Sequence, residues 1–193
     1  PSFLLSIVPS FLLSFFTSSP RSFFPSFLLS FLPSVLLSFL GICMSEPLWD
    51  RTHPFVIPVT ASDRHVDGYG HVSTHNYVQW MIDCAFAHSA SLGLDEVTCK
   101  TMARGMAAIS FDVQLLGSAY EGDELEVATW IVDPDGRIRL ARKFQILHPE
   151  SGRTLAPGHF KFVCTNLDTG KAVRMPQIFK ETYVMVSEPV VSV

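Results

Sequence analysis

The residues best placed to do chemistry lie in the loop Asp63–Gly70, where Asp67 stands between a strand-like stretch and a helix-like stretch. The first N–H groups of a helix have no partners inside it, and the helix dipole adds partial positive charge where they point. A carboxylate beside that end can act on a bound carbonyl, as a nucleophile or by activating water, while the N–H groups hold the developing oxyanion. The spacing therefore favours chemistry on a carbonyl at this helix end.

The elements that position this loop follow from the spacing of apolar residues. Phe55–Thr60 has the pattern of a strand, and Val72–Leu92 predicts a helix with apolar residues at three- and four-residue steps. Gly93 is a suitable residue to follow the end of that helix. Gly68 and Gly70 allow the loop backbone to turn sharply and to approach a ligand closely.

The rest of the chain predicts a β-rich half. A short helix is expected over Asp95–Met102 and another over Pro176–Tyr183, with a loose tail over Met185–Val193. Four strands are expected between the two short helices, over Met106–Leu116, Glu124–Val132, Arg137–Leu147 and Thr154–Asn166. Turn sequences join most of them as hairpins. One long helix followed by such strands predicts an α+β arrangement, an antiparallel sheet wrapped around the helix.

Several motifs stand at characteristic spacings. Around the loop they read Asp67-x-x-Gly70-His71-Val72-x-x-x-Asn76-Tyr77-x-x-Trp80, and further along Gly122-Asp123 and Phe160–Thr165 followed by Asp168-x-Gly170. Together these motifs resemble those of the hotdog-fold thioesterases of the 4-hydroxybenzoyl-CoA thioesterase type. The resemblance covers most of the chain after about Phe55.

This resemblance implies a hotdog fold and an acyl-CoA thioesterase that releases a carboxylic acid and free CoA, with no cofactor and no metal. It implies that Asp67 is the catalytic carboxylate and that the backbone N–H of Thr74 polarises the thioester carbonyl. The expected substrate-binding residues are Gly70, His71 and Gly105. The resemblance also implies a homodimer or homotetramer, with each site at a subunit interface.

Two positions depart from the family pattern. His65 stands where the family usually has an Asp, two residues before the catalytic one, and Ser73-Thr74 stands where members often carry Asn-Asn. Two other functions stay open, a non-catalytic acyl-binding dimer, which His65 makes conceivable, and a hotdog dehydratase, whose proline-containing Asp and His pattern is absent here. For Asp67 itself the alternative is a role as a turn or cap residue.

Other polar residues raise further hypotheses. His71 and His75 stand one helical turn apart, but a zincin would have Glu directly after the first His, so we expect no metal. Asp112 is either a second acid or an ordinary surface residue on its strand. A set of basic residues on one strand either contacts CoA phosphates or forms a solvated face, namely Arg137, Arg139 and Lys143 with Arg142.

Composition divides the chain into two parts. Pro1–Cys43 contains one charged residue, Arg21, and repeats Pro-Ser-Phe-Leu as a translated CCTT repeat would, so we expect it not to belong to the native protein. Prolines interrupt every window in it that is long enough to span a membrane. The hotdog domain is expected over residues 44–193.

The charge and the cysteines of that domain bear on its partners and compartment. The whole chain has a net charge of -4 and Arg21 contributes +1, which leaves -5 on the remainder and argues against a nucleic-acid partner. The four cysteines show no paired spacing, as expected of reduced thiols in a cytoplasmic protein.

Overall fold

The computed structural model describes residues 49–185 and 187–190. The chain falls into two units, Pro1–Ser45 and Glu46–Val193, and every described residue belongs to the second. The expectation that residues 1–43 are foreign to the native protein therefore lies outside the described residues and stays a prediction.

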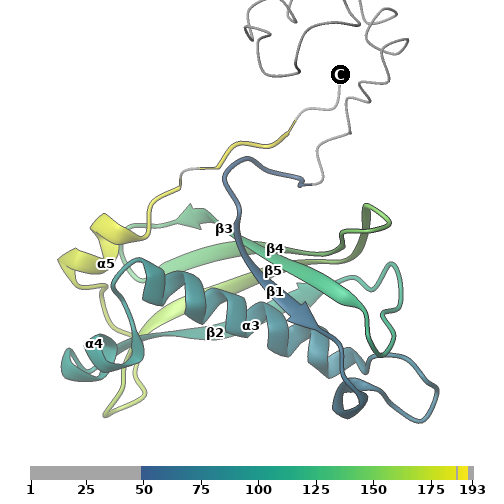
Figure 1. The fold of residues 1–193 in the computed structure, drawn as a ribbon. Helices are drawn as coiled ribbons and strands as arrows, with labels where there is room; N and C mark the ends of the chain where they lie inside the picture. The colour runs from purple at the N-terminus through teal and green to yellow at the C-terminus, as the bar shows by residue number, and fades with distance from the viewer. Residues whose placement is uncertain (1–48, 186, 191–193) are drawn as a thin grey trace, which may run out of the picture. The chain divides into compact units, whose positions relative to one another are not determined.

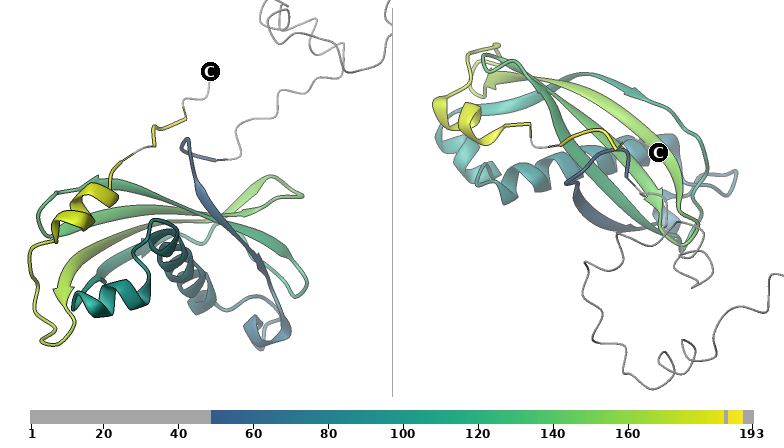
Figure 2. Two further views of the ribbon diagram at one scale, coloured as in Figure 1. Left: turned by 60° about the vertical axis from the view of Figure 1, so that its left-hand side comes forward. Right: turned by 90° about the horizontal axis from the view of Figure 1, so that it is seen from above.

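An antiparallel sheet of five strands forms most of the described domain (Figure 1). Its spatial order is β1-β3-β4-β5-β2, which leaves β1 and β2 at the two edges. The strands are β1 Phe55–Thr60, β2 Arg104–Val113, β3 Glu124–Pro134, β4 Arg139–His148 and β5 Arg153–Asn166. The long helix α3, Thr74–Ser91, lies on the concave side of the curved sheet (Figure 2). The predicted antiparallel sheet around a central helix is confirmed.

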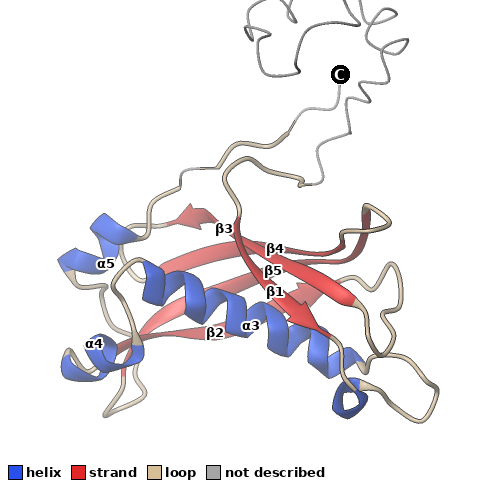
Figure 3. Ribbon diagram, viewed as in Figure 1, coloured by secondary structure: helices blue, strands red, loops and turns tan. Residues whose placement is uncertain are grey.

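Three short helices complete the domain. They are the 3₁₀ turn η2, Asp63–His65, the helix α4, Glu96–Thr101, and the helix α5, Gln177–Thr182. Figure 3 shows α4 and α5 near the C-terminal end of α3, whereas η2 and the following loop lie at its N-terminal end.

Helix α3 begins two residues later than predicted. Val72 pairs with Val66 in an isolated antiparallel bridge, which closes the preceding loop as a small hairpin, and Ser73 becomes the N-cap. The hydrophobic pattern extended the helix to Val72 because this residue is buried and apolar, although its backbone is committed to the bridge.

The middle of α3 packs closely against β5. Met81 is fully buried halfway along the helix, and it lies over Gly158, where an added Cβ would meet the Met81 Sδ at 2.7 Å. A glycine at this position therefore lets helix and sheet approach each other. Tyr77 and Trp80 are buried on the same helix.

Strand β3 is buried on both faces over Val127–Ile131. The cause is the segment before β1, which lies against the outer face of the sheet. The Trp130 Nε1 donates to the Thr52 carbonyl at 2.9 Å, and the Asp50 N–H donates to the Gln145 Oε1 at 2.9 Å.

The segment after α5 also differs from the prediction, which made Met185–Val193 a loose tail. In the part of it that the structure describes, Ser187 is buried and Pro189 forms a bridge with Arg51. The Arg51 Nη2 donates to the Ser187 carbonyl at 2.9 Å. The two ends of the described domain are therefore held together.

Candidate active site

The loop before α3 is a tight hairpin with Asp67 at its start. The Asp67 N–H donates to the His71 carbonyl at 2.9 Å, and the Gly70 N–H donates to the Asp67 carbonyl at 3.0 Å. Gly70 has φ +83°, a conformation that side chains with a Cβ rarely adopt. The sequence thus builds a compact turn that presents an exposed Asp67.

The carboxylate of Asp67 is partly engaged in this turn. Its Oδ1 accepts the Tyr69 N–H at 2.8 Å, which fixes the orientation of the side chain. Among the described residues, no donor is bonded to the Oδ2. The Asp67 side chain therefore stabilises the turn through its Oδ1, while its Oδ2 is available to react.

The N-terminus of α3 is open beside this carboxylate. Ser73 is the N-cap residue, but its side chain makes no capping hydrogen bond in the part of the chain that the structure describes. Thr74, the first helical residue, is exposed. Its N–H is one of the donors that a helix cannot satisfy internally, so it can bind an oxyanion.

Two buried hydrogen bonds fasten the segment after β2 to this helix end. The Val72 N–H donates to the Ala119 carbonyl at 2.9 Å, and the Ala119 N–H donates to the Tyr77 hydroxyl oxygen at 2.8 Å. His71 lies edge-on to Tyr120 of the same segment, with ring centroids 5.8 Å apart. The C-terminal end of β2 therefore lies at the same end of α3 as Asp67.

His65, one of the two departures from the family pattern, has a structural role. Its Nδ1 accepts the Ser62 N–H at 3.0 Å, and its carbonyl accepts from the Asn76 side chain at 2.8 Å. Its ring also lies edge-on to Trp80 at 5.3 Å. His65 therefore ties η2 to α3.

The predicted site residues form one group and one outlier. Asp67, Gly70, His71 and Thr74 lie together at the N-terminal end of α3. Gly105 lies near the other end of this helix, which is about 27 Å long at 1.5 Å per residue. Within one chain the structure does not bring Gly105 to the carboxylate.

Gly105 lines a cavity of about 750 Å³ between α3, α4 and the start of β2. Most of the lining is apolar and includes Phe86, Ala90, Leu94 and Met106. A Cβ at Gly105 would meet the Leu167 Cδ2 at 2.9 Å, so the glycine lets the Leu167 side chain pack closely against this part of the wall. The cavity has the size and character of a small-molecule site.

A buried polar cluster that the sequence analysis missed adjoins this cavity. Arg142 was predicted among the basic residues that could contact CoA phosphates, which is wrong because only 2% of it is exposed. The strand alternation contained the signal, since Arg142 is out of phase with Arg139 and Lys143 and so points toward α3. Its guanidinium donates to the His88 Nδ1 at 2.9 Å and to the Ser89 Oγ at 3.1 Å.

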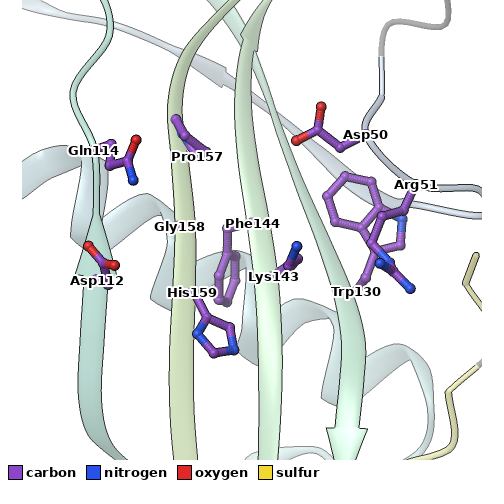
Figure 4. Close-up of a pocket in the computed structure, with 10 residues that line it drawn as sticks. All are labelled: Asp50, Arg51, Asp112, Gln114, Trp130, Lys143, Phe144, Pro157, Gly158 and His159. Carbon is purple, nitrogen blue, oxygen red and sulfur yellow. The ribbon is translucent and has the colours of Figure 1, made fainter. Parts of the chain in front are cut away.

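The other basic residues and Asp112 lie elsewhere. Asp112, His159 and Lys143 are cross-strand neighbours, and they line a hollow of about 160 Å³ on the face of the sheet away from α3 (Figure 4). Asp112 is thus an exposed surface residue, the second of its two predicted roles. Arg137 lies in the turn before β4 and is exposed.

Neither a metal cluster nor a membrane span is found in the part of the chain that the structure describes. Over residues 49–185 and 187–190, no three His, Cys, Asp or Glu side chains gather in a way that could hold a metal ion. No helix in these ranges combines the length and the hydropathy needed to cross a membrane.

Solved structures with this arrangement include several thioesterases. A 1,4-dihydroxy-2-naphthoyl-CoA thioesterase from Synechocystis is 20% identical, with a TM-score of 0.61 over 68% of this chain and 96% of that one. A Staphylococcus aureus protein solved in complex with CoA is 20% identical, with a TM-score of 0.63 over 67% and 81%. A gentisyl-coenzyme A thioesterase is 19% identical, with a TM-score of 0.60 over 67% and 99%.

These similarities confirm the predicted hotdog fold. No curated protein sequence matches the chain. The family model described as thioesterase-like superfamily matches residues 59–182, well over half of the chain. This match includes the Asp67 hairpin, all of α3 and the Gly105 cavity wall, and the chain therefore belongs to the thioesterase-like superfamily.

Proposed function

We propose that this protein is an acyl-CoA thioesterase, which hydrolyses a CoA thioester to a carboxylic acid and free CoA. The observation that carries the proposal is the exposed Asp67 carboxylate beside the uncapped N-terminus of α3. The superfamily supports the same class of reaction, and two of the similar structures are named as CoA thioesterases.

The site supplies two elements of catalysis. The N–H of Thr74 donates to the thioester oxygen and stabilises the negative charge that develops on it. Asp67 either takes a proton from the attacking water or attacks the carbonyl itself. In both routes the C–S bond breaks and CoA leaves as its thiolate, and in the second route water then hydrolyses the resulting anhydride. Both routes use the ionised carboxylate, and neither needs a metal or a cofactor.

We further propose that the protein works as a homodimer joined along β2. This strand is a sheet edge, and its side chains Ile109 and Phe111 are 54% and 59% exposed. An unpaired edge with exposed apolar side chains is a site for pairing with another strand. A second copy supplies that strand.

Antiparallel pairing of β2 with its symmetry mate would complete the site. The Gly105 end of one β2 then lies beside the Val113 end of the other. Because the Val113 end is on the same side as Asp67, the cavity of one subunit reaches the carboxylate of the next. This arrangement accounts for the separation of Asp67 and Gly105 within one chain, and it makes the cavity the acyl site.

A non-catalytic acyl-binding dimer is the second candidate. The hydrogen bond from the Tyr69 N–H to Asp67 favours it, because that bond alone can explain an Asp at this position.

We place the protein in the cytoplasm, since all three cysteines in the described ranges, Cys84, Cys99 and Cys164, are free thiols.

The test is complementation between two inactive variants. Asp67→Asn removes the carboxylate, and Ala90→Trp fills the cavity at the other end of α3. Heterodimers of the two carry one site with both defects and one intact site. After random exchange of equal amounts, we expect about a quarter of the wild-type rate, because half of the dimers are mixed.

The control is the double variant, which carries both substitutions in one chain. Mixed with either single variant it forms no intact site, so activity should stay absent. Activity in that control, or no recovery in the first mixture despite proven exchange, would contradict the shared site. A wild-type protein that hydrolyses no acyl-CoA from a broad panel would leave the binding dimer as the function.

A further inference from the structure

Arg142 is a buried positive charge without a carboxylate. It lies on β4 under the C-terminal half of α3, and no Asp or Glu side chain in the described ranges lies within ion-pair distance of it. Burying a charge costs several kcal/mol in general unless an opposite charge or good hydrogen bonds compensate it. The guanidinium of Arg142 has hydrogen bonds, but the described chain supplies it with no anion.

The immediate neighbours of Arg142 are all neutral. Burial, reinforced by the positive charge of Arg142, lowers the pKa of His88 to about 4, so its Nδ1 accepts from the guanidinium as a neutral ring. The guanidinium carbon lies 5.5 Å from the ring centroid of Tyr183, and burial raises the pKa of that phenol. The site thus stays at a net positive charge at neutral pH.

Two hydroxyl groups separate this charge from the cavity beside Gly105. Ser89 and Tyr183 both line the cavity, and the Tyr183 hydroxyl donates to the Ser89 Oγ at 3.1 Å. The Ser89 Oγ also accepts from the Arg142 Nη2 at 3.1 Å and donates to the Ala85 carbonyl at 3.0 Å. One side of the cavity is therefore a pair of polarised hydroxyls backed by a cation.

The remaining polar residues of the cavity are occupied elsewhere. Asp95 accepts the Thr98 N–H as the cap of α4, and Glu96 pairs with Lys100. The three of these residues that line the cavity, Asp95, Glu96 and Lys100, are exposed. The Thr165 hydroxyl donates to the Gly105 carbonyl at 3.3 Å. Tyr183, in contrast, is buried, so Ser89 and Tyr183 mark the inner side of the cavity.

We propose that the cavity accepts an acyl group whose far end carries a carboxylate next to Arg142. On binding, the hydroxyls of Ser89 and Tyr183 turn their protons from the Ala85 carbonyl and the Ser89 Oγ to this carboxylate. The inference rests on the proposed function, because it takes this cavity as the acyl site. Apolar residues such as Phe86, Leu94 and Met106 cover the methylene chain. The terminal carboxylate supplies the anion that the chain itself does not place beside Arg142.

An acyl chain that ends in a methyl group would contact the same apolar residues but would not place an anion beside Arg142. Its methyl end would face two hydroxyls and leave the charge of Arg142 uncompensated, and a site built for a polar group discriminates strongly against a ligand that lacks it. Arg142 and the two hydroxyls are therefore specificity-determining residues, and Asp67 carries the chemistry.

The kinetic test compares matched pairs of CoA thioesters with the full-length wild-type protein. The pairs are butyryl and succinyl, hexanoyl and adipoyl, and octanoyl and suberoyl CoA. For at least one pair we expect kcat/KM to be at least about tenfold higher for the ω-carboxy member, the scale of one well-placed charged hydrogen bond. Equal or lower values for the ω-carboxy member in every pair would overturn the inference and leave the thioesterase proposal intact.

Variants assign the preference to this cluster. Arg142→Met removes the charge and keeps much of the volume, Tyr183→Phe removes only a hydroxyl, and Arg174→Met makes the same change as the first at an exposed arginine. We expect the preference to be lost in Arg142→Met, to fall about threefold or more in Tyr183→Phe, and to persist in Arg174→Met. A preference that survives in Tyr183→Phe would contradict the assignment even if Arg142→Met does not fold.

A binding measurement separates this inference from the thioesterase proposal. Free suberate and octanoate are titrated against the wild type and the Tyr183→Phe variant, with the melting temperature and calorimetric binding as readouts. Suberate should bind the wild type more tightly than octanoate does, and Tyr183→Phe should weaken only suberate. If no CoA thioester is hydrolysed, the reaction proposal fails, and the suberate result still decides whether the cavity binds a carboxylate.

Discussion

The two ends of α3 are built in different ways. At the N-terminal end, Asp67, Gly70, His71 and Thr74 come from one short run of sequence and stand in an exposed hairpin at the helix start. At the C-terminal end, the cavity and its polar cluster are assembled from α3, α4, β2, β4, β5 and the residue after α5. The difference teaches that the residues of the proposed chemistry are local in the chain, whereas those of the proposed selectivity are brought together by the fold.

Substitution of the Asp67 carboxylate is the strongest test of this difference between the two ends of α3. Asp67→Asn keeps an oxygen that can accept the Tyr69 N–H but removes the charge and the basicity. We expect hydrolysis to fall by about 10²-fold or more, with little change in melting temperature and no change in acyl preference. Asp63→Asn is the matched control, since Asp63 also accepts a backbone N–H and lies outside the turn. A destabilised but nearly fully active Asp67→Asn protein would leave Asp67 as a turn residue only.

A second substitution tests the helix end through the backbone. Proline is well tolerated at the first helical position, and Ser73 before it has φ -64° and ψ 142°, which suits a following proline. Thr74→Pro therefore removes the N–H donor with little strain, and we expect a loss of about 10²-fold in kcat. Thr74→Ala keeps the donor and should stay within about threefold of wild type. Similar rates for both variants would contradict the role of this N–H.

A charge on the sheet edge tests whether the two ends meet across subunits. Ile109→Lys places a like charge twice at the proposed interface, and we expect the dimer dissociation constant to rise about tenfold or more in sedimentation experiments. Activity should fall in parallel at low protein concentration. Val97→Lys is the control, because Val97 is 72% exposed on α4 and is not part of the β2 strand. A wild-type monomer that is fully active would rule out the shared site.

The smallest effect concerns acid stability at the C-terminal end. The pKa of His88 is lowered to about 4, first by burial and then by the nearby Arg142 charge. In the unfolded chain this ring is protonated below about pH 6.5, whereas in the folded protein it stays neutral down to about pH 4. The free energy of unfolding should therefore fall as the pH drops from about 6.5 to 4. Because the ring is partly exposed, we expect a loss of only about 1 kcal/mol.

Urea unfolding at several pH values measures this loss. His88→Gln should flatten that part of the profile, since glutamine does not titrate there. A profile that is the same for the wild type and His88→Gln would show that this ring does not carry the acid sensitivity.

The sequence was sufficient for the fold because its signals are local. The 3.6-residue period marked α3, and turn sequences such as Asp133–Gly136 marked the strand connections. The start of α3 was misplaced because the bridge between Val66 and Val72 depends on the shape of the loop. Burial of Arg142 could be suspected from strand parity, but its partners Ser89 and Tyr183 are distant in sequence and meet only through packing.

The position of Gly105 shows a further limit of sequence reasoning. It was predicted beside the substrate from the family resemblance, yet one folded chain places it at the opposite end of α3 from Asp67. In the proposed dimer its role depends on a second copy, and pairing between chains leaves no pattern within a single sequence beyond an apolar edge strand. The proposed dimer is the arrangement in which both predictions hold together.

The close packing of Met81 on Gly158 gives α3 a mechanical property. This contact lies near the middle of the helix, so it can act as a pivot with arms of about 11 Å toward Thr74 and about 15 Å toward Ser91. A tilt of about 3° would then move the Thr74 end by about 0.5 Å, which is the tolerance of a catalytic geometry. An acyl group that fits the cavity badly would tilt one arm and misalign the oxyanion donor on the other. A poorly fitting acyl group would thus lower kcat as well as binding affinity. The helix would couple the fit in the cavity to the position of the Thr74 N–H.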